Sequence, residues 1–217
     1  MEILQFMTPV EQIENWFKSQ KWEAFPFQKQ VWKAYLNGKS GMLNAPTGSG
    51  KTYALGLGFL ADYLTHQHLK EYQQGIQVIW ITPIRALAKE IESSLTDACE
   101  ALGIPWEVAK RTGDTSSKER ARQKKKLPHI LITTPESLQL LLASKGYAKQ
   151  FIHLKCIVND EWHELLGSKR AVQMELAHSR LKAVCKNLRI WGISATIGNM
   201  EEGIEVLLGS DFWKQEH

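Results

Sequence analysis

The sequence lacks the long apolar segments and leader signals that would direct a protein into or across a membrane. No uncharged run reaches the roughly 18 residues of a membrane helix, and the one near the middle of the chain covers only residues 72–84. The N-terminus, MEILQF, has an early acid and no basic residue ahead of its apolar residues, so a signal peptide is not expected. We therefore expect a soluble cytoplasmic protein with no membrane partner.

Cysteine is also scarce. Cys99, Cys156 and Cys185 are too far apart for a CxxC metal pair, and an odd number cannot all pair with one another. This usage is typical of a reducing compartment in which thiols fill the core. No flexible linker or internal repeat divides the 217 residues, and 43% hydrophobic residues are enough for an ordinary core. The sequence therefore predicts one domain.

Five short apolar runs predict β-strands. Each is continuous rather than alternating, as in strands that are buried on both faces of a parallel sheet. Most are followed by turn residues and a helical pattern, as at residues 84–102, 135–143 (with Pro135 in the first turn) and a final helix capped by Asn199. This alternation predicts an α/β fold with a parallel sheet, whose ligands bind at the carboxyl ends of the strands. The five runs are residues 41–44, 76–81, 129–133, 155–159 and 188–193.

A phosphate-binding loop follows the first predicted strand. Residues 45–52 read APTGSGKT, which departs from the GxxxxGK[ST] pattern only in its first residue. Glycines let backbone N–H groups curl around a phosphate, and the next helix adds its positive N-terminus. The strand before it and the helical pattern at 53–64 after it disfavour a chance glycine turn. The pattern assigns triphosphate binding to Thr47, Gly48, Ser49, Gly50, Lys51 and Thr52, with Lys51 on the β- and γ-phosphates and Thr52 on Mg²⁺.

An acid pair follows the fourth predicted strand. Asp160 can hold the magnesium and Glu161 can polarise an attacking water, because an acid at a neighbouring strand end lies close to the phosphate loop. Two acids that merely cap the next helix are the alternative. Together with Lys51, these residues form the predicted catalytic set.

Positive charge is concentrated in one segment. Residues 110–126 hold eight Lys and Arg residues against two acids, a net of +6 in a chain whose total is +4. Such a patch can attract phosphate backbones. A solvated helix face is the alternative reading.

Taken in order, these motifs resemble the DExH-box helicases of superfamily two. APTGSGKT, DEWH at 160–163 and SAT at 194–196 carry the resemblance, and FPFQ at 25–28 is similar to the Q motif. TPIRALA at 82–88 resembles motif Ia, while TGDT at 112–115 and TTPESL at 133–138 resemble the Ib region. The run from 160 to 170 is especially similar to the Lhr-type branch with its ligase-associated DNA-repair relatives. The resemblance covers about 22–209 and implies a RecA-like lobe, a three-layer sandwich with helices on both faces of the sheet.

The resemblance implies roles residue by residue. Gln28 would bind the edge of the adenine base, so ATP with Mg²⁺ is the expected substrate. Trp22 or Phe25 would stack on the base, although a Trp near an apolar run is more often part of the core. His163, Ser194 and Thr196 would couple ATP hydrolysis to the nucleic-acid face. Without the resemblance, the SAT motif would be read as an ordinary strand-to-helix turn. Glu136 would organise its turn as a helix N-terminal residue. The residues expected to face the nucleic-acid backbone are Arg85, Thr112, Gly113, Thr134 and Glu136.

Helicases of this superfamily work with two RecA-like lobes, and only 21 residues follow Thr196. The expectation is therefore the first lobe alone (residues 1–217), which binds ATP–Mg²⁺ and single-stranded or partly duplex nucleic acid weakly and does not unwind it. DNA is favoured over RNA, and the resemblance implies a repair ligase or nuclease as a partner beside the second lobe. Two alternatives remain open: a non-catalytic nucleic-acid-binding module regulated by ATP, and a small-molecule phosphotransferase, for which no substrate-lid insertion is seen.

Overall fold

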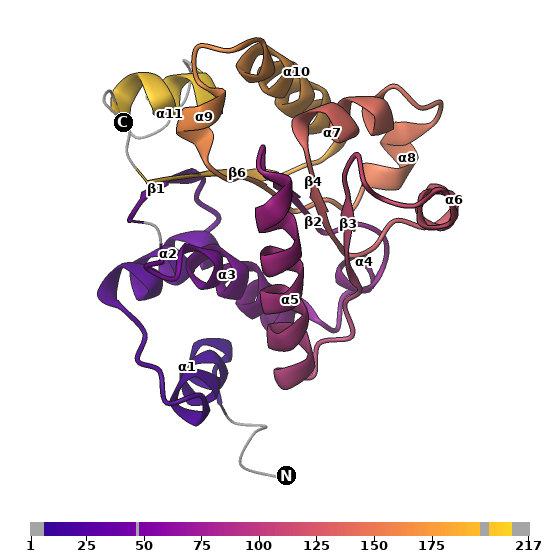
Figure 1. Ribbon diagram of the computed structural model, residues 1–217. Helices are drawn as coiled ribbons and strands as arrows, with labels where there is room; N and C mark the ends of the chain where they lie inside the picture. The colour runs from indigo at the N-terminus through magenta and orange to yellow at the C-terminus, as the bar shows by residue number, and fades with distance from the viewer. Residues whose placement is uncertain (1–6, 47, 196–199, 210–217) are drawn as a thin grey trace.

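The computed structural model describes residues 7–46, 48–195 and 200–209, and its centre is a six-stranded sheet (Figure 1). Every strand pairs in parallel with its neighbours, in the order β1-β6-β5-β2-β4-β3. The carboxyl ends of the strands therefore meet along one edge, as the α/β pattern predicted. The strands are β1 (Gly41–Asn44), β2 (Val78–Ile81), β3 (Val108–Arg111), β4 (Ile130–Thr133), β5 (Cys156–Asn159) and β6 (Arg189–Ser194).

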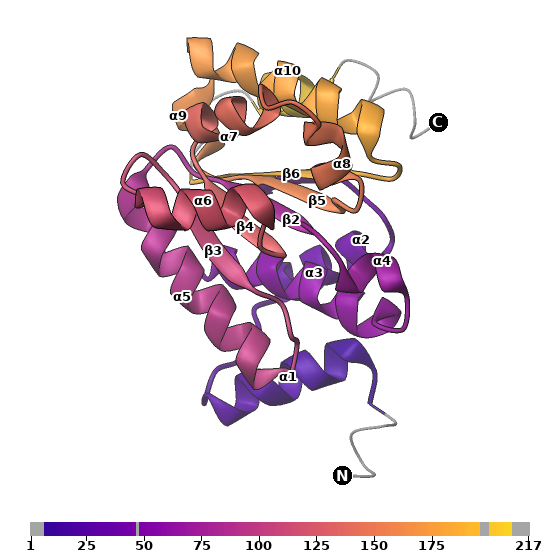
Figure 2. The ribbon, with the colours of Figure 1, turned by 90° about the vertical axis from the view of Figure 1, so that its right-hand side faces the viewer.

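Helices cover both faces of the sheet (Figure 2). Alternate residues of each central strand enter different apolar clusters: Val78 and Trp80 pack into one, Ile79 and Ile81 into the other. The first cluster lies under α1 (Pro9–Ser19), α2 (Pro26–Leu36), α3 (Lys51–His66) and α5 (Arg85–Ala101). The second lies under α7 (Pro135–Leu142), α8 (Tyr147–Phe151), α9 (Trp162–Leu165), α10 (Lys169–Val184) and α11 (Met200–Leu208). The predicted three-layer α/β architecture is confirmed.

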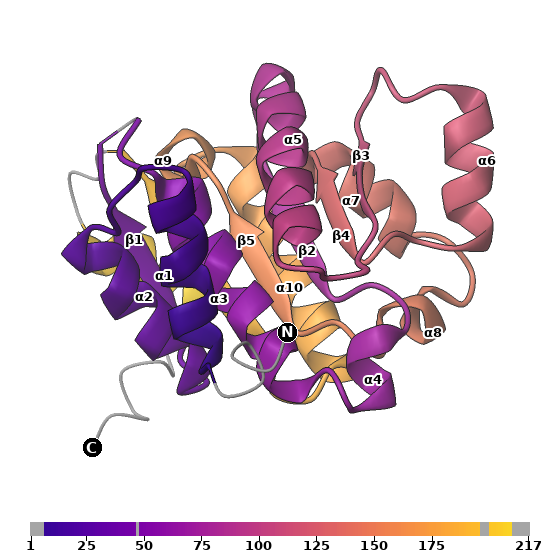
Figure 3. The same cartoon turned by 90° about the horizontal axis from the view of Figure 1, so that it is seen from below.

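Most predicted elements lie where the patterns placed them. Thr134 caps α7 by accepting from the backbone N–H of Ser137, and Pro135 occupies its first turn, where a missing N–H costs nothing. The expected cap of the last helix, Asn199, lies outside the described residues. Two short helices complete the chain, α4 (Lys70–Gln73) and α6 (Ser117–Lys125), and Figure 3 shows α6 at the outer side of β3.

Several elements were not predicted, including α2, α8 and α10, and two others change the extent of the fold. The edge strand β3 reads VAKR and lies at the start of the basic segment, so its two apolar residues gave no continuous run. Helix α1 precedes the expected core, yet Ile13 and Phe17 are buried among residues of α2 and α3. The apolar core therefore reaches further toward the N-terminus than the helicase-like motifs do.

The three cysteines fill the core, as expected from their scarcity. All three are free and buried. Burial raises the pKa of the Cys99 and Cys156 thiols to about 12 and that of the Cys185 thiol to about 11. Since the thiolate is the reactive form, these side chains are chemically inert at neutral pH.

Candidate functional site

The phosphate loop connects β1 to α3 at the carboxyl edge of the sheet. Gly48 and Gly50 have φ values of +78° and +82°, a left-handed conformation that turns successive N–H groups to one side. A Cβ on Gly50 would also lie 2.7 Å from the Gln28 Nε2, so a larger residue would displace this amide as well as strain the backbone. Ser49 closes the turn through its hydroxyl, which donates to the Pro46 carbonyl at 2.7 Å. Thr47 lies outside the described residues.

Lys51 is the first residue of α3, and its ammonium group is nearly buried. The Nζ lies 3.8 Å from Glu161 Oε1, and the two side chains are only 10% and 13% exposed. Within the described part of the chain, this Nζ makes no hydrogen bond. Because a buried ammonium without hydrogen-bonded partners is costly, the site fits an anion that would supply them, such as the phosphates of a nucleotide.

Asp160 follows β5 and is 7% exposed. Its Oδ2 accepts from the Trp80 indole at 3.3 Å, and its Oδ1 accepts from the Glu161 backbone N–H at 3.0 Å. Burial raises the pKa of this carboxyl to about 6, and the neighbouring Glu161 charge adds to the effect. A buried carboxylate held in this way fits a divalent cation, which would offset the cost of its charge.

A magnesium site here would be completed by the nucleotide. No cluster of three His, Cys, Asp or Glu side chains suited to a metal ion occurs in residues 7–46, 48–195 and 200–209. Mg²⁺ is commonly held by one or two protein oxygens together with substrate phosphates, so Asp160 and the Thr52 hydroxyl are a sufficient protein contribution. Thr52 is partly exposed at the start of α3, one residue after Lys51.

Glu161 has an unusual backbone. Its φ of +50° and ψ of +45° place it in the left-handed region, which a non-glycine residue occupies at an energetic cost. This conformation separates the direction of its side chain from that of Asp160 and starts α9 immediately afterwards. The two acids therefore belong to different local geometries, as their separate predicted roles require.

His163 connects the acid pair to β6. Its Nδ1 lies 2.9 Å from the Ser194 hydroxyl and 3.5 Å from Glu161 Oε2. Two of the three predicted coupling residues thus contact each other directly, one from α9 and one from the end of β6. The third, Thr196, lies outside the described residues.

The residues expected around the base are partly brought to this site. Gln28 is buried, its Oε1 accepts from the Phe25 N–H at 2.9 Å, and its Nε2 donates to the Gly50 carbonyl at 3.0 Å. Phe25 is 54% exposed and stacks on Phe27, while Trp22 is 45% exposed and packs against Tyr53 with ring centroids 5.5 Å apart. Gln28 therefore joins this segment to the phosphate loop, a contact that the sequence did not reveal, and its reading of adenine stays a prediction.

The expected nucleic-acid residues lie at the carboxyl ends of β2, β3 and β4. Arg85 Nη1 contacts Asp114 Oδ1 at 3.1 Å, and a Cβ on Gly113 would lie 2.8 Å from the Arg85 guanidinium. Arg120, which the sequence analysis did not single out, donates to the carbonyls of Thr112, Gly113 and Thr115 at 3.1, 2.7 and 2.9 Å. The turn at 112–115 is therefore fixed by a guanidinium, and Arg85 lies directly over it.

The second turn of this face is organised by helix capping. Thr134 is buried at the N-cap of α7, and the next side chain but one, Glu136, pairs with Arg170 Nε at 2.7 Å. Glu136 thus stands in the first turn of the helix, where a carboxylate is favourable, as predicted. Its ion pair with Arg170 from α10 was not foreseen.

The basic segment divides into two groups. Lys110 pairs with Glu92 at 3.1 Å, Arg122 pairs with Glu107 and Glu119, and Arg120 holds the turn already described. The remaining lysines of this segment, Lys118, Lys124, Lys125 and Lys126, are exposed on or next to α6. Three of the eight basic residues are thus structural, four remain accessible to phosphates, and Arg111 is partly buried at the end of β3.

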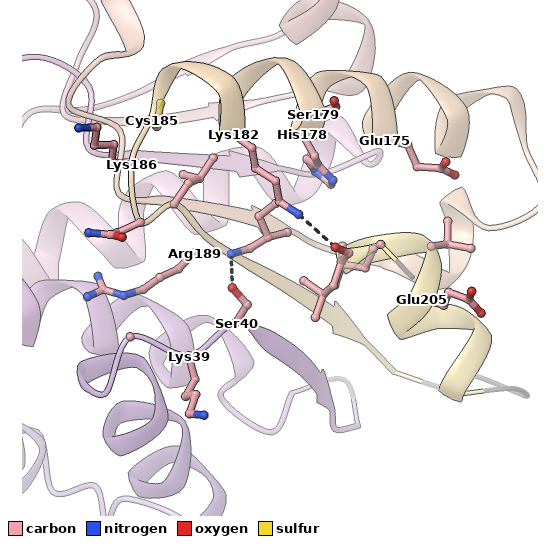
Figure 4. A pocket seen from close by; sticks show the side chains of 18 of the residues that line it. Lys39, Ser40, Glu175, His178, Ser179, Lys182, Cys185, Lys186, Arg189 and Glu205 are labelled. Carbon is pink, nitrogen blue, oxygen red and sulfur yellow. Dashed lines mark hydrogen bonds between the residues drawn. The ribbon is translucent and has the colours of Figure 1, made fainter. Parts of the chain in front are cut away.

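A separate groove lies at the opposite ends of the strands (Figure 4). It is bounded by the connection from α2 to β1, the start of β6 and the ends of α10 and α11. Lys182 Nζ donates to the Leu208 carbonyl there at 3.0 Å, and Ser40 Oγ accepts from the Ile190 N–H at 3.0 Å. None of the predicted site residues lines it.

No helix of the described residues is long and apolar enough to span a membrane.

Comparison with known proteins agrees with this geometry. The DEAD/DEAH box helicase family matches residues 25–203. The ATP-dependent helicase Lhr-Core of Sulfolobus acidocaldarius is 36% identical over 220 residues, which cover 97% of this chain and 25% of the relative. This chain therefore spans about a quarter of the length of the curated relatives it matches.

Solved structures lead to the same group. The helicase Lhr of Mycobacterium smegmatis, bound to single-stranded DNA and AMP-PNP, superposes with a TM-score of 0.75 at 30% identity, over 95% of this chain and 27% of that one. The helicase MrfA bound to DNA gives a TM-score of 0.78 at 26% identity, over 92% and 28%. The resemblance carried by the motifs is confirmed: the chain belongs to the DEAD/DEAH box helicase family, is similar to its Lhr-type members, and has the fold of their first RecA-like lobe.

Proposed function

We propose that this chain is the ATP-binding first lobe of an ATP-driven DNA helicase or translocase. The observation that carries the proposal is the convergence of Lys51 and Glu161, from two motifs far apart in the sequence, at 3.8 Å in a nearly buried site. A buried cation and carboxylate beside a left-handed glycine loop are what triphosphate hydrolysis needs.

Each residue has a separate task in this proposal. Lys51 would bind the β- and γ-phosphates, and Thr52 and Asp160 would hold Mg²⁺, which would neutralise phosphate charge. Glu161 orients the attacking water and accepts its proton. The exposed ring of Phe25 receives the adenine, and Gln28 reads its edge by exchanging a contact that its amide makes with Phe25 or Gly50.

Coupling would run through His163 and Ser194. The 2.9 Å contact between them joins the residue two positions after Glu161 to the end of β6. A shift of Glu161 on hydrolysis would therefore reach the connection that leaves β6. Arg85, the 112–115 turn and Thr134 hold the nucleic-acid backbone at the other strand ends, without reading its sequence.

The second lobe is proposed to come from the rest of a longer protein. The first-lobe fold and the quarter-length match to the Lhr-Core relatives support this. An arginine finger from such a lobe contributes about 10³–10⁵ to the rate in related nucleoside triphosphatases, so the 217-residue chain should hydrolyse ATP slowly and not unwind DNA. DNA is preferred as the substrate because the two similar structures contain DNA. A repair role beside a ligase or nuclease is proposed from the subfamily resemblance alone.

Two measurements on the chain test the proposal. Titration with a fluorescent ATP analogue, with and without Mg²⁺, should show binding that Mg²⁺ strengthens. Steady-state ATP hydrolysis should stay near background with and without single-stranded DNA. Absence of nucleotide binding would refute the ATP site, whereas DNA-stimulated turnover at the rate of a full-length helicase would refute the first-lobe assignment.

A further inference from the structure

A buried polar pair lies in the apolar layer between β5 and α10. Asn159, the last residue of β5, is 0% exposed, and His178 of α10 is 3% exposed. Met174, Ala177 and Leu181 of the same helix are buried around it in the second apolar cluster. Polar groups in such a layer are tolerated only when they are hydrogen-bonded, so this pair needs an explanation.

The hydrogen bonds of the pair determine its protonation. Asn159 Nδ2 donates to the Trp191 carbonyl at 3.3 Å, because a carbonyl can only accept. The Asn159 Oδ1 is then the atom that faces His178 Nε2, at 3.0 Å, so Nε2 must carry the proton. Nδ1 is left as a bare acceptor, and it makes no hydrogen bond with the described residues.

The charge state agrees with this assignment. Burial lowers the pKa of His178 to about 3, and the Lys182 charge acts in the same direction. The imidazole is therefore neutral in the folded chain at any pH near neutrality. It is one of the side chains that line the groove of Figure 4, on the α10 side.

The position of Asn159 gives the pair a second consequence. It immediately precedes Asp160 and Glu161, and its side chain points toward α10 while that of Asp160 contacts Trp80 on the other face of the sheet. The end of β5 is thus held from both sides. Three elements, α10, β5 and β6, meet through the side chain of Asn159.

We propose that Asn159 and His178 are positioning residues, which hold the end of β5 so that Asp160 and Glu161 stand ready for a magnesium–nucleotide complex. The inference rests on the proposed function, because it concerns the same site. Under this proposal, α10 also helps to set the geometry of Asp160 and Glu161. The same helix forms one wall of the distant groove.

The test compares His178→Leu with His178→Gln in the 217-residue chain. The quantity measured is the factor by which Mg²⁺ tightens ATP binding. His178→Leu should reduce this factor on the order of tenfold, as loss of an outer-shell partner commonly does. ATP affinity without Mg²⁺ should not change, since the phosphate loop is untouched. His178→Gln should keep the factor, because its amide N–H can still donate to Asn159.

Two controls separate positioning from general destabilisation. Leu181→Ala opens a cavity in the same layer without touching Asn159, so it should lower the Tm and leave the Mg²⁺ factor unchanged. If His178→Leu does not fold, the double variant Asn159→Leu/His178→Leu leaves neither side chain of the pair unsatisfied and should fold, yet lose the factor. Nitrogen-15 NMR of the wild-type imidazole should show the proton on Nε2.

An unchanged Mg²⁺ factor in folded His178→Leu, or a proton on Nδ1, would overturn the inference and leave the proposed function standing. A wild-type chain that binds no ATP would overturn both, because nothing would then be positioned. A reduced factor in His178→Leu with recovery in His178→Gln supports the inference.

Discussion

The carboxyl edge of the sheet has a nucleotide half and a nucleic-acid half, and their charged side chains differ in burial and in hydrogen bonding. Where β1 and β5 end, charges are buried and incompletely satisfied: Lys51 Nζ lacks a hydrogen bond among the described residues, and Asp160 has a raised pKa. Where β2, β3 and β4 end, most charges are exposed and paired: the side chains of Arg85 and Asp114 are 60% and 72% exposed and pair with each other, whereas Arg111 Nη1 is buried without a hydrogen bond among the described residues.

This contrast indicates how tightly each half depends on its ligand. A buried, unsatisfied site gains much from the right ligand, because the ligand removes an existing cost. An exposed and paired site gains little per contact, and salt screens what it gains. The nucleotide half should therefore show large effects of single substitutions, and the nucleic-acid half small, salt-dependent ones.

The largest effect is expected at Lys51. Lys51→Ala should weaken ATP binding roughly 100-fold, because it removes charge-assisted hydrogen bonds worth about 1.5–3 kcal/mol each. Calorimetric or fluorescence titration measures the change. Lys29→Ala, which removes the same charge from a half-exposed pair with Glu14, is the control and should bind normally. Equal losses of ATP affinity in the two variants would contradict the difference between the buried and the exposed sites.

The next effect is the pH dependence of magnesium. Asp160 must lose its proton to bind Mg²⁺, and its pKa is about 6. The tightening of ATP binding by Mg²⁺ should therefore be complete above pH 7 and fall about tenfold per unit below pH 6. Because this folded-state pKa lies above the unfolded value, the ionised carboxylate also lowers stability as pH rises from about 4 to 6.

Protonation of ATP itself also changes Mg²⁺ binding with pH, so the experiment needs a variant that lacks the Asp160 carboxyl group. Asp160→Asn should retain the pH profile of ATP itself and lose the component that belongs to the carboxyl group. If the wild type and Asp160→Asn gave the same profile, the assignment of the magnesium ligand would be wrong.

A moderate effect is expected at Arg120. Arg120→Ala removes three hydrogen bonds to the carbonyls of the 112–115 turn, so single-stranded DNA should bind about three- to tenfold more weakly, with a loss of stability near 1 kcal/mol. Arg122→Ala removes the same charge from the same helix. An equal loss of DNA affinity in both variants would show that charge, and not the shape of the turn, matters.

The smallest effect is expected at Asp114. Asp114→Ala frees Arg85 for a phosphate, so DNA affinity should rise about two- to threefold at low salt and the free energy of unfolding should change by less than about 0.5 kcal/mol. The gain should vanish at high salt. Fluorescence anisotropy at two salt concentrations measures it, and a gain that persists at high salt would contradict the exposed, screened character of this half.

The nucleotide half was the more predictable from sequence. Its strands are continuous apolar runs, and its residues are contiguous in short motifs whose spacing has a chemical reason, so APTGSGKT and DEWH could be located directly. The structure places Lys51, Asp160, Glu161, His163 and Ser194 at neighbouring strand ends, as those motifs implied.

The missed features depend on contacts between residues that are distant in sequence. Gln28 and Gly50 are 22 positions apart, and nothing in either motif shows that one amide joins them. His178 looks like an ordinary residue of an amphipathic helix until α10 is placed on β5. Strand β3 has only two apolar residues, and its backbone pairing with β4, not its side chains, makes it a strand.

The buried thiols have a practical consequence for following the motion of the lobe. A cysteine introduced at the exposed Lys124 would react with a maleimide dye well before Cys99, Cys156 or Cys185, whose thiols are covered and protonated. Dyes attached in this way could report distances to a second label on bound DNA. The native chain therefore suits fluorescence measurements without prior removal of its own cysteines.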